Sequence, residues 1–215
     1  MVNKNNFENI LKELEPYHAK LVAVSKSKPV KMINQLYGFG QKIFGENYVQ
    51  ELKEKFHQLP EIIEWHFIGH LQTNKVKFIA PFVSLIHSVD SMKLLREINK
   101  EAIKNNRTTD CLLQVHIAEE ETKTGLSFTE CEMILKSGQL VDLENICIKG
   151  LMGMATLTND SRLVRKEFKS LRLFFEQAKT NFEFLSMGMS ADYKIALEEG
   201  SNLVRIGSAI FGDRI

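Results

Sequence analysis

Lys26 follows a β-branched run and is the residue whose position most favours covalent chemistry. Alternation along a strand places Val22, Val24 and Lys26 on one face. If that face is buried, the lysine amine loses hydration, and a desolvated, neutral amine can form a Schiff base with an aldehyde. The alternative is a lysine whose ammonium group reaches solvent along its apolar stem. Lys28 is the weaker candidate, because Pro29 indicates that the chain turns away there.

Two loops rich in glycine and serine, near the end of the sequence, have the composition of an anion site. One is the stretch Ser-Met-Gly-Met-Ser at 186–190, and the other is Gly-Ser-Ala-Ile-Phe-Gly at 207–212. Small residues let backbone N–H groups approach a phosphate, and serine hydroxyls add further donors. The alternative is that these glycines and serines only cap helices.

Arg205 lies within the last apolar run and carries a charge that needs a partner. Alternation predicts that Val204 and Ile206 face outward, so that Arg205 faces inward with Leu203. An inward arginine beside a phosphate loop requires an anionic or acceptor partner, either a ligand or a structural ion pair. Asn47 directly follows another run and either reaches the same region or caps a helix.

These side chains need a scaffold that brings strand ends together, and the sequence alternates short apolar runs with amphipathic stretches. A leading helix is predicted at about 7–15, and Ser127 with Glu130 fits a capping box ahead of a later helix. Alternating strands and helices predict a parallel sheet with right-handed crossovers. The eight predicted strands are 21–25, 43–46, 64–68, 83–87, 111–116, 146–152, 182–186 and 203–206.

Eight such units in 215 residues predict a single α/β domain over 1–215, a (β/α)8 TIM barrel with an extra N-terminal helix. A doubly wound open sheet is the alternative, because short strands are easily miscounted. In such a barrel the active site lies at the carboxyl ends of the strands. Lys26, Asn47 and the two loops all fall there.

Composition excludes several classes of protein. With 28 Lys and Arg against 27 Asp and Glu, the net charge is +1, which argues against nucleic acid or an anionic membrane as the main partner. Three cysteines without a CxxC pair argue against a disulfide scaffold and a thiolate zinc site, and we expect no metal. The polar start and the lack of a run of ~18 apolar residues predict a soluble cytoplasmic protein.

Longer motifs carry a resemblance to a known family. They lie in order along nearly the whole chain. The sequence resembles the pyridoxal phosphate homeostasis proteins of the YggS/PROSC type. The matching stretches are Ala-Val-Ser-Lys at 23–26 with Pro29, Phe-Gly-Glu-Asn-Tyr-Val-Gln-Glu at 44–51, Trp-His-Phe-Ile-Gly at 65–69 with Leu-Gln-Thr-Asn-Lys at 71–75, and the stretches 186–190 and 204–212.

The resemblance implies a barrel similar to the N-terminal domain of bacterial alanine racemase. It also implies pyridoxal 5′-phosphate (PLP) held as a Schiff base on Lys26. By the same resemblance, Ser190, Gly207 and Ser208 contact the phosphate, and Arg205 approaches the pyridine nitrogen. It establishes no catalytic residue. The further residues that it places around the pocket are Asn47, His66, Ser186 and Met187.

The function implied is PLP binding for intracellular vitamin B6 homeostasis and for amino-acid and keto-acid balance, without strong catalytic turnover. The partners implied are PLP, amino acids and, transiently, PLP-dependent apo-enzymes, with the chain itself a monomer. An arginine at the pyridine nitrogen fits this function. A guanidinium cannot accept a proton and leaves the ring a weaker electron sink than an acid would.

Two enzyme functions remain as alternatives. A PLP-dependent amino-acid racemase needs a second acid or base on the opposite face of the cofactor. In alanine racemase a C-terminal β domain supplies that group, whereas here only three residues follow Gly212. The other alternative is a PLP-free aldolase that uses Lys26 and the same anion loops on a sugar phosphate.

Overall fold

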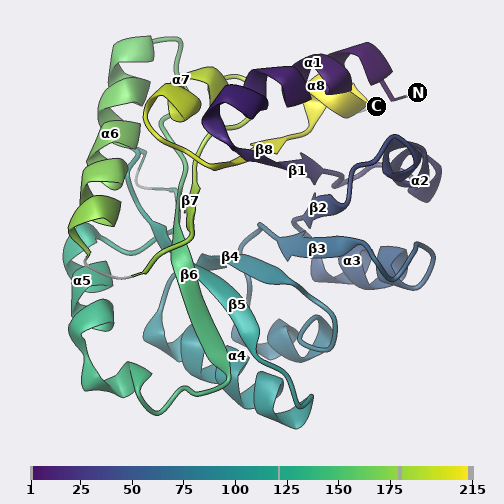
Figure 1. Ribbon diagram of the computed structural model, residues 1–215. Coiled ribbons are helices and arrows are strands. Elements are labelled where there is room, and N and C mark those ends of the chain that lie inside the picture. The colour runs from purple at the N-terminus through teal and green to yellow at the C-terminus, as the bar shows by residue number, and fades with distance from the viewer. Residues whose placement is uncertain (1, 121, 179–180, 213–215) are drawn as a thin grey trace.

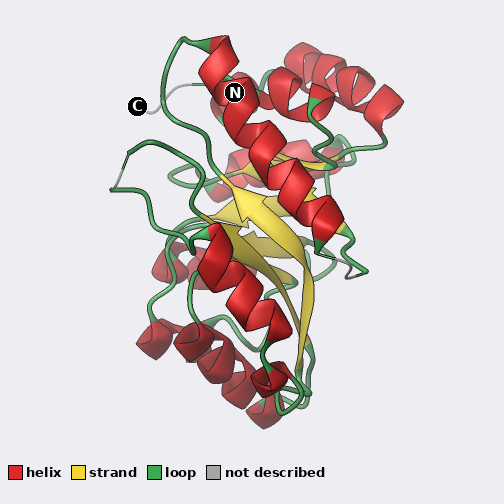
Figure 2. Ribbon diagram, turned by 90° about the vertical axis from the view of Figure 1, so that its left-hand side faces the viewer, coloured by secondary structure: helices red, strands yellow, loops and turns green. Residues whose placement is uncertain are grey.

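The computed structural model describes residues 2–120, 122–178 and 181–212, and the strands in these ranges form a closed barrel. The strands follow one another around the barrel in chain order, all parallel, and β8 closes on β1. Figure 2 shows the strands at the centre with helices on both sides. The predicted (β/α)8 barrel is therefore confirmed, and the open sheet is not formed.

The strands agree with the predicted runs to within two residues at every end. The runs at 83 and 182 extend too early, although Ser84 still donates to the Trp65 carbonyl (2.8 Å) and Glu183 to the Lys149 carbonyl (2.7 Å). The strands are β1 Lys20–Val24, β2 Ile43–Glu46, β3 Glu64–Phe67, β4 Leu85–Val89, β5 Thr109–Val115, β6 Ile146–Gly153, β7 Phe184–Ser186 and β8 Leu203–Ile206.

Helices separate the strands and cover the outside of the barrel. The predicted capping box is confirmed, since Ser127 Oγ accepts from the Glu130 N–H (3.2 Å) and Glu130 accepts from the Ser127 N–H (2.8 Å). The α-helices are α1 Lys4–Leu14, α2 Val30–Gly38, α3 Val49–Phe56, α4 Met92–Lys104, α5 Phe128–Lys136, α6 Ser161–Gln177, α7 Tyr193–Glu198 and α8 Ser208–Phe211. The 3-10 turns are η1 Glu15–Tyr17, η2 Thr73–Phe78 and η3 Gly138–Leu140.

Apolar side chains form two separate clusters, one on each side of the barrel wall. The large cluster lies between the strands and the helices and includes Leu21 and Ala23 of β1. The small cluster contains Val22, Leu85, Leu112, Met152 and Leu203, whose strand positions place them inside the barrel. Alternation therefore sets the direction of each strand residue, as the sequence predicts for β1 and β8.

The N-terminal helix α1 begins at Lys4, three residues before its predicted start, because Asn3 caps it by accepting from the Asn6 N–H (3.0 Å). Its buried face is formed by Phe7, Ile10 and Leu14. In Figure 1, α1 lies beside the short α8 and close to α7. It therefore covers the part of the barrel that α8 is too short to cover.

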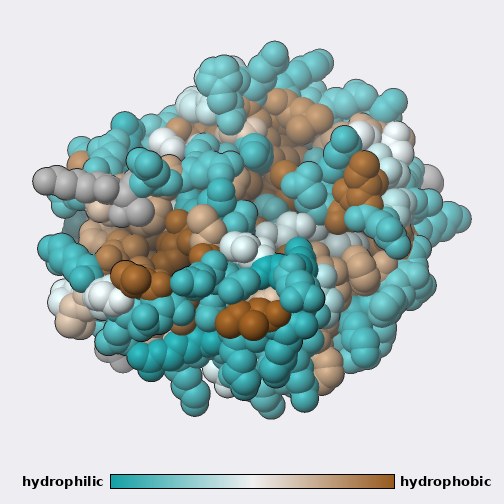
Figure 3. All heavy atoms as spheres, turned by 60° about the horizontal axis from the view of Figure 1, so that its bottom comes forward, coloured by the Kyte–Doolittle hydropathy of each residue, from teal (hydrophilic) through white to brown (hydrophobic). Residues whose placement is uncertain are grey.

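The outer surface is predominantly hydrophilic. Figure 3 shows one face on which hydrophilic side chains surround separate apolar patches. Scattered exposed apolar residues of this kind are ordinary for a folded domain. Across the described ranges, none of the helices combines the length and the apolar character needed to cross a bilayer.

Candidate functional site

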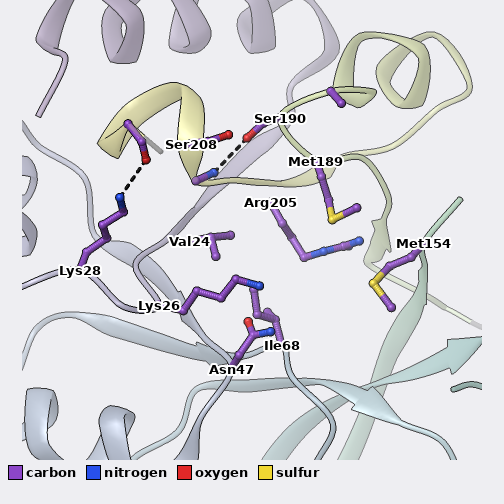
Figure 4. A pocket seen from close by; sticks show the side chains of 13 residues that line it. Val24, Lys26, Lys28, Asn47, Ile68, Met154, Met189, Ser190, Arg205 and Ser208 are labelled. Carbon is purple, nitrogen blue, oxygen red and sulfur yellow. Dashed lines mark hydrogen bonds between the residues drawn. The ribbon is translucent and has the colours of Figure 1, made fainter. Parts of the chain in front are cut away.

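A cavity of about 420 Å³ opens where the strands of the barrel end. Each of its walls follows the carboxyl end of a strand, as expected for the active site of such a barrel. Figure 4 shows Ser190 and Ser208 at one side of the cavity, Asn47 and Ile68 at the other, and Lys26 and Arg205 extending between them. The described lining residues are Val24, Lys26, Lys28, Asn47, Ile68, Met154, Met189, Ser190, Ala191, Arg205, Gly207, Ser208 and Gly212.

Lys26 occupies the first central position of a tight turn after β1. The Lys28 N–H donates to the Ser25 carbonyl (3.0 Å), and Ser27 adopts a left-handed φ of 60°. A positive φ at the second central position defines a type II turn. Because Val22 faces into the barrel and Val24 lines the cavity, Lys26 enters the cavity on the same side. The predicted direction of its side chain is confirmed.

Lys28 also lines the cavity, but its ammonium group points to the carbonyls at the end of α8. Its Nζ donates to the Gly212 carbonyl (2.8 Å) and lies 3.4 Å from the Phe211 carbonyl. Figure 4 shows the first of these contacts on the α8 side of the cavity. Lys28 therefore connects the turn that carries Lys26 to α8.

The two glycine- and serine-rich loops meet at one wall of the cavity. The Gly207 N–H donates to Ser190 Oγ (3.3 Å), which joins the loop after β7 to the start of α8. Gly188 has a φ of +89°, and a Cβ there would lie 2.7 Å from the Ala196 Cβ, so this turn requires glycine. The structure thus brings together the hydroxyls of Ser190 and Ser208, which the sequence places in separate loops.

Arg205 is 3% exposed and extends from β8 into the base of the cavity. One guanidinium nitrogen donates to the carbonyl (3.0 Å) and the hydroxyl (2.5 Å) of Ser186, and another donates to the Gly153 carbonyl (3.0 Å). Burial lowers its pKa to about 10, against the opposing attraction of Asp192, so it remains a cation at neutral pH. These hydrogen-bond partners are neutral groups, and the charge of Arg205 borders the cavity.

Beneath Arg205, a hydrogen-bonded chain continues down the inside of the barrel. Ser186 Oγ lies 3.2 Å from His87 Nδ1, and His87 Nε2 lies 3.0 Å from His66 Nδ1. An arginine can only donate, so Ser186 Oγ accepts from Arg205, and its contact with His87 Nδ1 continues the chain to His66. Burial lowers the pKa of His66 to about 3 and that of His87 well below its usual value, so both rings are neutral.

Three of the residues predicted around the pocket do not line this cavity. His66 and Ser186 belong to the buried chain below Arg205. Met187 is fully buried among the outer apolar residues, and its N–H donates to Ser201 Oγ (3.2 Å). Because successive strand residues alternate, an inward Ser186 forces Met187 outward. None of these three side chains lines the cavity, so their predicted contact with a cofactor stays a prediction.

Asn47 does line the cavity, at the end of β2. Its backbone is packed against Gly69, where a Cβ would lie 2.3 Å from the Asn47 carbonyl oxygen. Its side-chain Oδ1 is buried and has no hydrogen-bond partner among the described residues. A buried, unpaired acceptor at the edge of a cavity is the kind of atom that a bound ligand would satisfy.

Sequence reasoning missed His87 and the methionines at the cavity. Leu85 faces into the barrel, so the period of two also directs His87 inward from β4. The same rule extends from the inward Met152 to Met154, which lines the cavity. Met189 lies in the loop after β7, where strand alternation no longer applies.

The closed barrel, with its ligand-sized cavity at the strand ends, places the chain in a well-defined class. The sequence model of the alanine racemase N-terminal domain family matches residues 3–215. Alanine racemase from Bartonella henselae has the same fold, with a TM-score of 0.70 at 17% identity, covering 94% of this chain and 56% of that one.

Relatives that match over most of their own length identify the family within this class. The pyridoxal phosphate homeostasis protein of Aquifex aeolicus is 40% identical over 201 residues, covering 91% of this chain and 87% of the relative. The solved structure of PipY from Synechococcus elongatus without PLP has a TM-score of 0.91 at 32% identity, covering 97% of this chain and 99% of that one. A second PipY structure, with PLP bound, has a TM-score of 0.87 at 31% identity, with the same coverage. The chain belongs to the family of pyridoxal phosphate homeostasis proteins.

Proposed function

We propose that this protein binds PLP in the cavity, covalently through Lys26, and controls the supply of this reactive aldehyde to other proteins. The observation that carries the proposal is the presence of an amine, two hydroxyls and a buried guanidinium around one cavity of about 420 Å³. PLP has an aldehyde, a phosphate and a ring nitrogen, each of which matches one of these groups. The PLP-bound PipY structure supports the same choice of ligand.

The residues that would hold PLP come from four strand ends. Lys26 supplies the amine for the aldehyde, and Ser190, Ser208 and the backbone at Gly207 supply donors for the phosphate. Arg205 supplies a donor for the ring nitrogen, held in place by Ser186 and Gly153. Asn47 offers an unpaired oxygen to a donor of the ligand. In this assignment His66, Ser186 and Met187 support the site from outside the cavity wall.

The same arrangement favours binding over catalysis. When bound, PLP supplies an electron-withdrawing ring, whose strength depends on protonation of its nitrogen. Arg205 cannot accept a proton, so it favours the unprotonated ring. The titratable groups that line the described cavity are Lys26, Lys28 and Arg205, and Lys28 is directed to the Gly212 carbonyl. We therefore propose a carrier of PLP rather than an amino-acid racemase.

We place this function in the cytoplasm, with the chain acting as a monomer. Amino acids and PLP-dependent apo-enzymes are the proposed partners that would receive or displace the cofactor. The relatives that this chain resembles are named for homeostasis rather than for a reaction, which supports this role.

The covalent assignment is tested by loading the protein with PLP, reducing it with borohydride and locating the added mass. We expect the label on Lys26 and a visible absorption band that Lys26→Ala removes. Lys31→Ala, a change to an exposed lysine on the neighbouring α2, is the matched control and should retain both. A label on another lysine, or an unchanged band in the Lys26→Ala protein, would contradict the assignment.

Two further measurements separate a carrier from an enzyme. Holoprotein mixed with an apo-enzyme that needs PLP should restore that enzyme's activity while its own absorption band declines. Exchange of the α-hydrogen of L- and D-alanine with solvent should remain at the level of free PLP. Sustained exchange by the holoprotein, lost in Lys26→Ala, would favour the racemase instead.

A further inference from the structure

Behind the turn that carries Lys26 lies a cluster of buried charges that the site described above does not use. It consists of Glu46 at the end of β2 and of Glu51 and Lys55, which are one turn apart on α3. Two of these residues, Glu46 and Glu51, belong to the motif at 44–51, of which Asn47 lines the cavity that holds Lys26. Phe44 packs outside the barrel, so alternation also directs Glu46 outward. The cluster therefore lies on the opposite side of the barrel wall from the cavity.

Lys55 is the centre of this cluster. Its Nζ donates to Glu46 Oε1 (2.6 Å), to Glu51 Oε1 (2.7 Å) and to the backbone carbonyl of Ser25 (2.7 Å). All three protons of the ammonium group thus have an acceptor. The side chain of Lys55 is 6% exposed and that of Glu46 is 0% exposed, so these charges are held away from solvent.

The cluster holds the backbone on both sides of Lys26. On one side, the Ser25 carbonyl accepts from Lys55, and Ser25 Oγ donates to Glu46 Oε1 (2.7 Å). On the other side, the Ser27 N–H donates to Glu51 Oε1 (2.6 Å). Lys26 therefore lies directly between two residues whose backbone groups are fixed by these hydrogen bonds.

The turn needs such support because of the conformation of Ser27. Its φ of 60° is left-handed, which is uncommon for a residue with a side chain. Such a conformation persists where surrounding groups determine it, and Glu51 accepts the N–H of this very residue. A change at Ser27 would rotate the adjacent peptide and move the Cα–Cβ bond of Lys26.

Stability alone is a poor explanation for these charges. Burying an ion pair removes both partners from water, and well-packed apolar residues in its place often stabilise a protein as well or better. Glu46 illustrates the problem, because its Oε2 is buried without a partner among the described residues. Desolvation also raises its pKa. Apolar residues at these positions could not form hydrogen bonds with the backbone of Ser25 and Ser27.

We propose that Glu46, Glu51 and Lys55 are positioning residues for Lys26, which fix the turn so that its amine reaches the aldehyde carbon of PLP. The inference rests on the proposed function of Lys26. In the attachment step, the neutral amine of Lys26 bonds to the aldehyde carbon, the carbon–oxygen bond of the aldehyde breaks, and the oxygen leaves as water with the two amine protons. The cluster contacts neither the phosphate loops nor Arg205, so it acts on this step and not on the rest of the site.

Glu51 offers the clearest test, because its side chain is 23% exposed and can be changed without opening the core. Glu51→Ala should slow the covalent attachment of PLP, which is measured by borohydride trapping on Lys26. It should also weaken PLP binding by about tenfold, as expected for the loss of a charge-assisted hydrogen bond. Glu51→Gln keeps an oxygen that can accept from Ser27 and should recover most of the rate. Glu54→Ala, on the exposed side of the same helix, is the matched control and should behave as wild type.

A second ligand separates positioning from general damage. Pyridoxine 5′-phosphate has an alcohol in place of the aldehyde, so it can occupy the ring and phosphate sites without bonding to Lys26. Its affinity should be the same in wild type, Glu51→Ala and Glu54→Ala. Lys55→Met should show the same pattern as Glu51→Ala, because it removes the donor to the Ser25 carbonyl on the other side of the turn.

The outcomes are distinct. If wild type itself does not attach PLP at Lys26, the proposed function fails. If wild type attaches PLP but Glu51→Ala and Lys55→Met attach it as fast as Glu54→Ala, the positioning role is wrong. The role is also wrong if both variants lose pyridoxine 5′-phosphate in proportion to PLP, since the cluster would then support the whole site. Slower attachment with unchanged binding of the alcohol is the result that we expect.

Discussion

At the scale of single residues, the base of the site depends on the hydroxyl of Ser186. It accepts from Arg205 at 2.5 Å and lies 3.2 Å from His87 Nδ1. Ser186 thus joins the guanidinium, which can only donate, to the ring of His87. Through His87 Nε2 the chain continues to His66 Nδ1. A single hydroxyl therefore links Arg205 to the two buried histidines.

Removing this hydroxyl should affect both stability and binding. Ser186→Ala leaves His87 Nδ1 without this hydrogen-bond partner and Arg205 with one acceptor fewer, and a buried unpaired group costs about 1–3 kcal/mol. Urea unfolding of the PLP-free protein should show this loss, and PLP titration should show weaker binding. Ser190→Ala changes a hydroxyl at the cavity wall and should weaken PLP binding with a smaller loss of stability. An unchanged urea midpoint for Ser186→Ala would contradict the proposed chain.

The direction of a side chain was predictable from the sequence, whereas its depth in the barrel was not. Alternation is local, so it correctly directs Lys26 and Arg205 inward. Whether an inward residue reaches the cavity or lies below it depends on the register of neighbouring strands, which is a long-range property. His66 and Ser186 therefore face inward but lie beneath the cavity.

At the scale of elements, the short helix α8 depends on segments far from it in the sequence. It carries Ser208 and has four residues, too few to be stable alone. From the N-cap of α1, the Asn3 N–H donates to the Ile210 carbonyl (3.0 Å), and from α1 itself Asn6 Nδ2 donates to the Ala209 carbonyl (3.1 Å). From the turn after β1, Lys28 donates to the Gly212 carbonyl (2.8 Å). The extra N-terminal helix thus stabilises one wall of the cavity.

This dependence predicts an effect of α1 on phosphate binding. Asn6→Ala removes one hydrogen bond to the Ala209 carbonyl and should weaken PLP binding about two- to twelvefold, since such a bond contributes about 0.5–1.5 kcal/mol. Binding of pyridoxal, which has no phosphate, should not change. Asn9→Ala, an exposed position on the same helix, is the control. Equal weakening of PLP and pyridoxal would show that α1 does not act through α8.

The sequence predicted the existence of this helix and of the barrel units, but not the contacts of α1. Its amphipathic pattern requires a buried face, which Phe7, Ile10 and Leu14 provide. Nothing in that pattern indicates which surface covers the face. The pairing with α8 follows from closure of the barrel, which brings the end of β8 next to β1.

At the scale of the whole molecule, the barrel has an unusually polar axis. Among the described residues, its inner apolar cluster has five buried members with three partly buried ones against them, whereas a typical barrel of this kind is filled by layers of branched side chains. Between the cavity and the amino ends of the strands lie Arg205, Ser186, His87 and His66. His66 also borders a hollow of about 200 Å³ at that far end. The stability of the fold is thereby linked to pH.

Both histidines are neutral in the folded protein because burial lowers their pKa values, that of His66 to about 3. The unfolded chain binds protons near pH 6.5, whereas the folded chain does not, so the free energy of unfolding falls as pH decreases below about 6.5. Each histidine contributes a slope of up to about 1.4 kcal/mol per pH unit, and above pH ~7.5 this contribution no longer changes. Wild type should therefore be markedly less stable to urea at pH 5.5 than at pH 7.5.

Replacing one histidine should reduce this pH dependence. His87→Gln removes one proton-binding group from the unfolded chain, so the difference in free energy of unfolding between pH 7.5 and 5.5 should shrink by about 1 kcal/mol, even if the variant is less stable at both values. His57→Gln, at an exposed position, is the control. Burial raises the pKa of Glu46, so this residue increases the free energy of unfolding as the pH falls. Wild type, His87→Gln and His57→Gln all keep Glu46, so its effect cancels in the comparison. An undiminished pH dependence in His87→Gln would mean that His87 binds its proton in the folded protein as well as in the unfolded chain.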